Sequence, residues 1–364
     1  PRYPKSRQEG HFRFIIGDRR TQDRLKGCVA AARSKYSIAP VSNKLESYLV
    51  YLVARAAFAL FRALPRRIAI SALDSLASLS YYIDARHRHI AQVNLLIAFP
   101  ELSERTRKSI ARRSFQNVAR NLLEISRLPD LSKKNISSLV QYDAECGLNN
   151  FEAARARGKG ILYVTGHFSA WELLPAAHAL HGHPLSFVTR PLDNAHLEQY
   201  MVRVREAAGN EVLAKKRSAR QILERLNAKG AVGILMDQNT SLQEGVFANL
   251  FGLPAATTAS VALLALRTDA TVLPGFLTPA KNGSYLIKFL PPVSLIRTGD
   301  KDRDVRLNTE LFNSVMEKII RSQPDSWLWG HRRWKNQPAE NPQDIYGLSR
   351  KDLTAFLAQK KQAS

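Results

Sequence analysis

The chain has 364 residues, which is enough for one large domain or two smaller ones. Its hydrophobic fraction of 45% is ordinary for a globular protein, and its two distant cysteines, Cys28 and Cys146, exclude a disulfide framework and a cysteine-based zinc site. Lysine and arginine number 54 against 31 acidic residues, and the formal net charge of +23 indicates a polyanionic partner such as nucleic acid, an anionic membrane, an acidic protein or a phosphorylated lipid.

Residues 1–44 are polar and carry scattered lysine and arginine, with glycine, serine and proline between them. We recognise no cleavable signal peptide in this stretch. We therefore expect a loosely ordered basic extension, which is either an arm that touches a membrane or a terminus without a role.

The segment from residue 45 to 83 is apolar and is expected to form two helices. Its first part reads LESYLVYLVARAAFALFRAL and is charged only at Glu46, Arg55 and Arg62. A spanning helix needs roughly 20 apolar residues and tolerates a central arginine badly, so we predict a helix that lies on a membrane. A second apolar helix is predicted at residues 68–83. The alternative is that both are ordinary helices packed on the core.

The rest of the chain divides into a helical part and a part with strands. Residues 84–150 are predicted to be helical, with a break at Pro100 and with Ser103 as the N-cap of the next helix. From about residue 151, short β-branched runs alternate with helical stretches, which predicts an α/β domain with a mainly parallel central sheet flanked by helices. The predicted strands are residues 161–165, 185–189, 232–236, 271–277 and 285–290. We assign residues 84–338 to this domain and 339–364 to a C-terminal tail.

Polar clusters follow the first three predicted strands. The sequences are T-G-H-F-S-A-W-E, T-R-P-L-D-N and M-D-Q-N-T, starting at Thr165, Thr189 and Met236. In open α/β sheets, chemistry gathers at the carboxyl ends of the strands, so the three clusters are expected to converge and form a pocket.

His167 and Glu172 are the candidate catalytic pair. Five residues of a regular helix turn through roughly 500°, so the two side chains would not share a helical face. They can meet if His167 lies in the turn after the strand and Glu172 in the first helical turn. Glu172 would then accept a hydrogen bond from one imidazole nitrogen, while the other nitrogen takes a proton from a hydroxyl. Such a general base suits direct attack of an acceptor hydroxyl on a bound thioester.

Several segments resemble one known family. G-H-F-S-A-W-E resembles the H-x-x-x-x-D/E signature of the lysophospholipid acyltransferase superfamily, and its surroundings resemble the lipid A (late) acyltransferase branch. R-P-L-D-N from Arg190, M-D-Q-N from Met236 and the glycine- and phenylalanine-rich loop at residues 245–258 resemble further segments of that branch. Two further segments also resemble this branch, V-N-L-L-I-A-F-P and W-L-W-G-H-R-R-W-K. The resemblance covers roughly residues 45–338.

The resemblance implies a glycerolipid-acyltransferase-like fold. It also implies transfer of a fatty acyl chain from acyl-acyl carrier protein, or acyl-CoA, to a hydroxyl of an anionic membrane glycolipid, foremost a lipid A precursor. His167 would be the base, Glu172 its partner, and Arg190 would stabilise the oxyanion or bind an acceptor phosphate. No metal or organic cofactor is implied, and the enzyme would act on the cytosolic face of the inner membrane. The remaining residues expected to contact substrate are Asn194, Asp237, Gln238, Phe247 and Phe251. For the two phenylalanines, the alternative is packing in the core.

Some features depart from the branch and leave other functions open. Ser169 stands where many members have glycine, and the F-P-E-G-T-R-type motif of glycerolipid acyltransferases is absent. The acceptor could instead be another glycosylated phospholipid, such as a mannosylated phosphatidylinositol. A non-catalytic protein that binds membranes or nucleic acid is the rival class, although no recognised nucleic-acid motif is present. Its basic charge would explain affinity for phosphate. The arginine-rich C-terminal run with Trp327, Trp329 and Trp334 would stack on bases, lie at a membrane interface or pack on the core.

Overall fold

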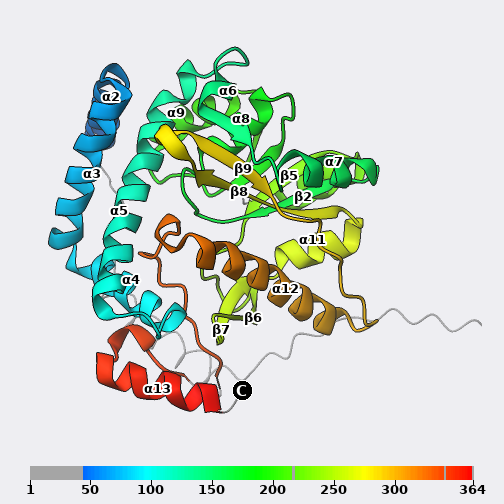
Figure 1. Ribbon diagram of the computed structural model, residues 1–364. Helices are drawn as coiled ribbons and strands as arrows, with labels where there is room; N and C mark the ends of the chain where they lie inside the picture. The colour runs from blue at the N-terminus through cyan, green and yellow to red at the C-terminus, as the bar shows by residue number, and fades with distance from the viewer. Residues whose placement is uncertain (1–43, 215–217, 340–341, 363–364) are drawn as a thin grey trace, which may run out of the picture. The chain divides into compact units, whose positions relative to one another are not determined.

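The computed structural model (Figure 1) describes residues 44–214, 218–339 and 342–362. The predicted basic extension lies outside these residues except for Lys44. By its contacts the chain divides into two compact units, residues 1–50 and 51–364. The first unit contributes only the start of helix α2 (Lys44–Ala63) to the described residues, and the fold below is that of the second.

The described residues begin with four long helices, which include the two predicted apolar ones. They are α2, α3 (Arg66–Ile83), α4 (Ala85–Ala98) and α5 (Glu104–Arg127). The chain breaks after α4 near Pro100, and the Ser103 hydroxyl accepts a hydrogen bond from the Thr106 amide at 3.2 Å, so both boundary predictions are confirmed. Among the helices within the described ranges, none combines the length and the apolar character that crossing a bilayer requires.

Helix α3 packs on α5 through small and aliphatic side chains. Ala69 and Leu73 of α3 are buried against Leu123 of α5. Two arginine–carboxylate pairs flank this contact, Arg66 with Glu124 and Arg120 with Asp74. The opposite side of α3 is uncovered: Ile68, Leu76, Leu79, Tyr82 and Ile83 are each more than half exposed.

The central sheet has seven strands in the order β1-β9-β8-β2-β5-β3-β4. Only β8 and β9 pair antiparallel, so the prediction of a mainly parallel sheet is confirmed. The five predicted strands are present within two residues of their expected ends. The strands are β1 (Val140–Tyr142), β2 (Ile161–Thr165), β3 (Ser186–Thr189), β4 (Glu211–Ala214), β5 (Ala231–Leu235), β8 (Thr271–Pro279) and β9 (Tyr285–Phe289).

The segment at residues 245–258, predicted as a loop, forms an antiparallel hairpin instead. Its strands are β6 (Gly245–Leu250) and β7 (Leu253–Thr258), joined through Phe251 and Gly252, which both have positive φ. Helix α12 (Lys301–Ser322) packs on this hairpin: Asn313 donates to the carbonyl of Asn249 and to the Thr257 hydroxyl. The predicted C-terminal tail also contains a helix, α13 (Arg350–Gln362).

Helices cover both faces of the sheet, as Figure 1 shows for α8 (Leu173–Leu180) and α9 (Ala195–Glu206) against α11 (Ser260–Thr268) and α12. Alternate residues of β2 divide accordingly. Tyr163 belongs to the cluster that includes α8 and α9, whereas Val164 belongs to the cluster that includes α10 (Ser218–Asn227), α11 and α12. We call these the α8 face and the α10 face. The shorter helices α6 (Ile136–Leu139) and α7 (Leu148–Ala156) precede β2.

The strand order reverses direction between β5 and β3. The connection from β2 to β3 passes over β5 through α8, and the connection from β4 to β5 passes over β3 through α10, on the opposite face. Right-handed crossovers that run in opposite directions must lie on opposite faces. Strands β3 and β5 pair at only two rows, Ser186 with Val232 and Phe187 with Gly233. Beyond them the strands part, at the kind of switch point where α/β proteins bind ligands.

Candidate active site

A cavity of about 960 Å³ opens at this switch point. Its lining includes residues that follow the ends of three neighbouring strands: His167 after β2, Arg190 after β3 and Gln238 after β5. The predicted convergence of the three polar clusters is therefore present in the structure. The volume lies at the upper end of the usual range for small-molecule sites.

His167 is held by the carboxylate of Asp237. Its Nδ1 lies 2.8 Å from Asp237 Oδ1, and its backbone amide donates to Oδ2, also at 2.8 Å. Gly166 makes this approach possible, because a Cβ at that position would lie 2.9 Å from the Asp237 carboxyl carbon. A carboxylate only accepts hydrogen bonds, so Nδ1 carries the proton and Nε2 carries the lone pair in the neutral ring.

Trp327 completes the shell around Asp237. Its indole Nε1 donates to Oδ2 at 2.8 Å. Burial disfavours the ionised carboxyl, but the His167 ring and amide and the Trp327 indole outweigh it and lower the pKa of Asp237 to about 2. Burial likewise disfavours the charged imidazole, but the Asp237 carboxylate raises the pKa of His167 above its ordinary value. The pair therefore combines a fixed anion with a stronger base.

The second imidazole nitrogen lies on the cavity side. The amide nitrogen of Gln238 is 3.4 Å from His167 Nε2, and the Trp171 ring lies edge-on with its centroid 5.2 Å from that of the imidazole. His167, Trp171 and Gln238 all line the cavity. A hydroxyl bound there can give its proton to Nε2 while Asp237 stabilises the resulting imidazolium.

The expected hydrogen bond between His167 and Glu172 is not formed, and this prediction is corrected. Both carboxylate oxygens of Glu172 accept from Arg205 of α9, at 2.9 and 2.7 Å. Its backbone amide donates to Asn121 of α5 at 3.1 Å. Glu172 precedes the first residue of α8, and from there its side chain reaches α9 rather than the imidazole. It still lines the cavity and contributes, behind Asp237, to raising the pKa of His167.

The remaining predicted residues occupy different surroundings. Arg190 is exposed at the cavity lining. Asn194 caps α9 by accepting from the amides of His196 and Leu197, and it is not among the lining residues. Asp237, predicted to contact substrate, is buried behind His167.

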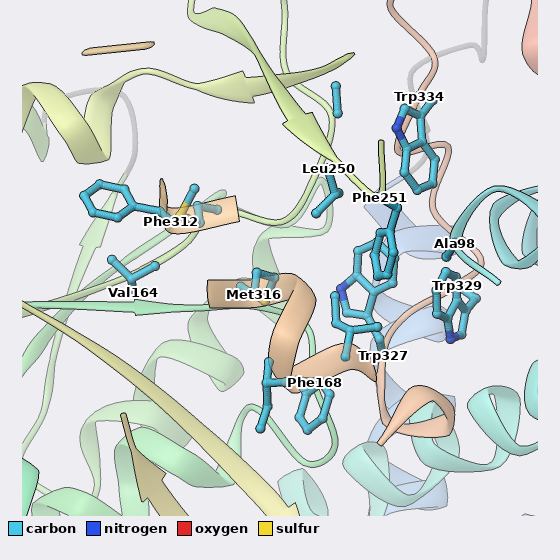
Figure 2. Close-up of a cluster of buried hydrophobic side chains, with 14 of the residues drawn as sticks. Ala98, Val164, Phe168, Leu250, Phe251, Phe312, Met316, Trp327, Trp329 and Trp334 are labelled. Carbon is cyan, nitrogen blue, oxygen red and sulfur yellow. The ribbon is translucent and has the colours of Figure 1, made fainter. Parts of the chain in front are cut away.

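Neither predicted phenylalanine lines the cavity. Phe247 is half-buried in β6. Phe251 lies in the core, where its ring meets Phe99 and three tryptophans. Figure 2 shows Phe251 with the three tryptophans. Its backbone amide donates to Glu317 of α12 at 2.8 Å. Phe251 therefore packs in the core, which was the alternative to substrate contact for both phenylalanines.

The tryptophan-rich C-terminal segment is internal. Trp327, Trp329 and Trp334 are at most 2% exposed, and Arg333 is fully buried, donating to Ala256 O and Thr257 Oγ1. The prediction that these tryptophans stack on nucleic-acid bases is therefore wrong, because their rings are covered. The segment instead supports the site: the amide of Leu328 donates to the carbonyl of His167 at 3.1 Å.

The sequence does not predict two of the contacts at the site, the hydrogen bond from Trp327 to Asp237 and the ion pair of Arg205 with Glu172. Trp327 lies 90 residues from Asp237 in the sequence and Arg205 lies 33 residues from Glu172. Neither pair has a local spacing signal, because the contacts are made only when the elements pack together.

Comparison with known proteins agrees with this geometry. A family model for bacterial lipid A biosynthesis acyltransferases matches residues 37–336. The chain is 25% identical over 248 residues to a lipid A biosynthesis acyltransferase of Haemophilus influenzae, covering 67% of this chain and 74% of the relative. It is 26% identical over 262 residues to the lipid A biosynthesis lauroyltransferase of Escherichia coli K12, covering 71% and 82%. It is also 26% identical over 258 residues to the palmitoleoyltransferase of that strain, covering 70% and 80%.

The resemblance inferred from the motifs is thus confirmed over most of the chain. The matched residues include His167, Asp237 and Trp327, which the structure brings together. The chain belongs to the bacterial lipid A biosynthesis acyltransferase family and is an enzyme of that family.

Proposed function

We propose that the protein transfers a fatty acyl chain from a thioester donor to a hydroxyl of a lipid A precursor. The donor is acyl-acyl carrier protein or acyl-CoA, and the enzyme works on the cytosolic face of the inner membrane. The observation that carries the proposal is the His167–Asp237–Trp327 arrangement, which leaves Nε2 of a base beside a cavity large enough for a lipid chain.

The reaction needs one proton carrier and no covalent enzyme intermediate. His167 Nε2 removes the proton of the acceptor hydroxyl while the oxygen attacks the thioester carbonyl. The tetrahedral intermediate collapses, the carbon–sulfur bond breaks, and the imidazolium returns its proton to the leaving thiolate. The products are the new ester and the free thiol, so protons and electrons balance. Asp237 fixes the Nδ1–H tautomer and stabilises the imidazolium, which makes it a positioning residue.

Arg190 and Gln238 are the groups available to the developing negative charge or to an acceptor phosphate. Arg190 lines the cavity and is exposed, so its guanidinium can meet an incoming anionic group. Gln238 lies beside His167 Nε2 and can orient the hydroxyl. Glu172 and Arg205 join α8 to α9 at the wall of the cavity. We propose that Glu172 acts on the base through its charge and through this wall.

The surface supports work at a membrane with anionic substrates. The uncovered side of α3 presents five large hydrophobic residues, and the chain carries a net charge of +23. Apolar side chains that enter the interface and basic residues that attract anionic headgroups act together in peripheral binding. The same charge favours an acidic carrier protein and a phosphorylated glycolipid.

The direct test is acyl transfer from acyl-acyl carrier protein and from acyl-CoA to membrane lipid extract, read by mass spectrometry. The wild-type protein should yield a lipid heavier by one acyl group, and His167→Ala should abolish it while retaining the wild-type thermal unfolding curve. The product mass identifies the acceptor. Transfer that persists in folded His167→Ala would remove His167 as the base, and a wild type inactive with both donors would contradict the enzyme assignment.

A further inference from the structure

The cavity extends onto both faces of the sheet, and its two sides differ. On the α8 face the lining is enclosed: Tyr163, Leu185, Phe187, His178 and Phe289 are each at most 9% exposed. On the α10 face Ile222, Ile234 and Leu264 are also buried, but the lining opens to solvent at exposed Gln243, Glu244 and Arg267. The two sides meet where β3 and β5 part.

The enclosed side runs across the strands under α8. Phe187 of β3, Gly233 of β5 and Tyr163 of β2 lie in one register row, and all three line the cavity. Gly233 lies between the two aromatic residues of this row and has no side chain. A Cβ built on it would lie 3.0 Å from Leu185 Cδ1 and 3.6 Å from Phe187 Cβ, so any side chain there would enter the space between two large neighbours.

Helix α8 forms the roof of this side. Leu174, Pro175 and His178 line the cavity, and their spacing of one and three residues places them on one side of the helix. Trp171, in the turn before α8, lines the cavity as well. Trp171 stands beside His167, and His178 lies farthest along the helix from it. The roof therefore leads from the reacting nitrogen into the protein interior.

A histidine between two tyrosines forms the inner end. His178 Nδ1 lies 2.8 Å from the Tyr142 hydroxyl, and Nε2 lies 2.8 Å from the Tyr163 hydroxyl. Burial lowers the pKa of His178 to about 3, so the ring is neutral in the working pH range, with one tyrosine donating to it and the other accepting. Phe289 packs against this ring and against Gly275. The end is closed, uncharged and satisfied in its hydrogen bonds.

We propose that this enclosed side, which we call the α8 arm, holds the acyl chain of the thioester donor, and that Gly233 and the His178–Tyr163 pair set the longest chain it accepts. The arm passes the Glu172–Arg205 pair near the base, and beyond that pair it is apolar with an uncharged, buried inner end. Such a space fits an alkyl chain whose carbonyl lies beside His167. The α10 side has buried aliphatic residues of its own, but it opens to solvent at Gln243, Glu244 and Arg267. The inference rests on the proposed acyl transfer and adds which residues select the chain.

The relatives show that such selection must be decided within each chain. Two proteins that are each 26% identical to this one are named a lauroyltransferase and a palmitoleoyltransferase, so the family assignment leaves chain length open. The relevant differences must lie in residues that line the arm, because burial of each further methylene stabilises binding only while the arm has room for it.

The first experiment measures transfer from saturated acyl-acyl carrier proteins of 8 to 18 carbons in competition. Gly233→Ala narrows the floor and Leu174→Phe narrows the roof, and both should move the preferred donor to chains at least two carbons shorter. The rate with the wild-type optimum should fall about tenfold, the effect of failing to bury two methylenes. Ala219→Val is the matched control, because it adds volume to the lining on the α10 face. A shift with Ala219→Val and none with the arm variants would overturn the proposal.

The second experiment separates this inference from the proposed function. S-alkyl coenzyme A thioethers of 8 to 18 carbons cannot react, and calorimetry measures their binding without turnover. Wild-type affinity should rise with chain length to a plateau, and Gly233→Ala and Leu174→Phe should move the plateau to shorter chains. A wild type that binds in this way but transfers nothing would contradict the function and leave the arm supported. Equal plateaus in wild type and both folded variants would overturn the arm while leaving the function intact.

Discussion

Asp237 accepts three hydrogen bonds, and two of them come from His167. This arrangement fixes the imidazole by its backbone as well as by its ring, so the orientation of Nε2 toward the cavity does not depend on a single contact. The acidic partner of the base is therefore built into the core, with its exposed fraction at 5%. A partner so placed stays ionised and ordered whether or not substrate is present.

Asp237→Asn should lower kcat by about 10³- to 10⁴-fold, because an amide nitrogen facing Nδ1 favours the wrong tautomer and the imidazolium loses its counter-charge. KM should change little, since Asp237 does not line the cavity. Glu172→Gln is the variant for comparison, because it leaves Arg205 without its anion. It should lower the free energy of unfolding by about 3 kcal/mol, and its loss of kcat should be smaller than that of Asp237→Asn. The opposite order of the two kcat effects would return the catalytic partnership to Glu172.

The pH dependence of kcat/KM should report His167. A general base works in its neutral form, so the rate is low below its pKa and rises as the pH passes it. Since Asp237 raises that pKa, the midpoint of the acidic limb should lie above the ordinary value of 6.5. In Asp237→Asn the midpoint should move to lower pH, because burial then acts without the compensating anion. A midpoint unchanged by that substitution would assign the limb to another group.

The partner of the base could have been predicted from strand pairing rather than from local spacing. Strands β2 and β5 are parallel neighbours, and Thr165 pairs with Leu235. Residues two positions beyond each strand end, His167 and Asp237, are therefore neighbours by register. The motif spacing drew attention to Glu172 because it is close in the sequence, while the order of the strands, which makes Asp237 the neighbour, is a tertiary property.

At the scale of elements, the C-terminal segment around Trp327 joins the core to the site. Trp327 forms a bridge with Phe168, the residue after the base, and Ser114 of α5 donates to the Trp327 carbonyl at 2.6 Å. The rings of Trp327 and Trp329 pack edge to face with centroids 4.6 Å apart. Figure 2 shows this cluster beside Phe251 of the hairpin. Three segments far apart in the sequence thus meet behind one carboxylate.

Trp327→Phe separates the two roles of this side chain. The substitution keeps an aromatic ring in the core but removes the donor to Asp237, so kcat should fall about tenfold, the effect of one hydrogen bond to a charged group. The acidic limb of the pH profile should also move, because Asp237 is less well held. Trp329→Phe is the control, since its indole donates to the Pro324 carbonyl and not to Asp237. If both variants lose activity equally, Trp327 acts only through packing.

The elements that sequence analysis found are those with their own periodicity. The five apolar runs became strands: β2, β5 and β8 are buried along most of their length, and β9 alternates buried and half-buried residues. Strand β1 spans only Val140–Tyr142 and exists because β9 pairs with it, so nothing local marks it. The hairpin at 245–258 contains glycine, proline and two residues with positive φ, and its burial beneath α12 decides its structure.

At the scale of the molecule, the basic charge and the exposed apolar surface both favour binding to an anionic membrane. The basic excess of the sequence is spread over the chain, whereas the exposed aliphatic and aromatic residues of α3 lie along one side of one helix. Long-range attraction between a basic protein and an anionic surface does not fix which side of the protein faces that surface. A row of apolar side chains on one side of a helix does fix it. The combination orients the molecule as well as attracting it.

Leu79→Glu combined with Ile83→Glu should weaken binding to vesicles of anionic phospholipid by tenfold or more. Each residue is more than half exposed on α3, so the double variant should fold normally while losing two apolar contacts and adding two repulsive charges. Co-sedimentation with the vesicles measures the bound fraction. Leu242→Glu is the control, because Leu242 is 60% exposed and lies outside α3, in the connection before the hairpin.

Raising the salt concentration separates the two contributions to this binding. Screening weakens the attraction of the basic surface and leaves the apolar contacts of α3 largely unchanged. Wild-type binding should therefore fall with salt but retain a residual fraction that the α3 double variant lacks. If the double variant and the Leu242→Glu control bind alike at every salt concentration, α3 does not enter the membrane, and the basic charge or the exposed apolar residues of α2 hold the enzyme there. The reaction would then need another element to bring His167 to the acceptor.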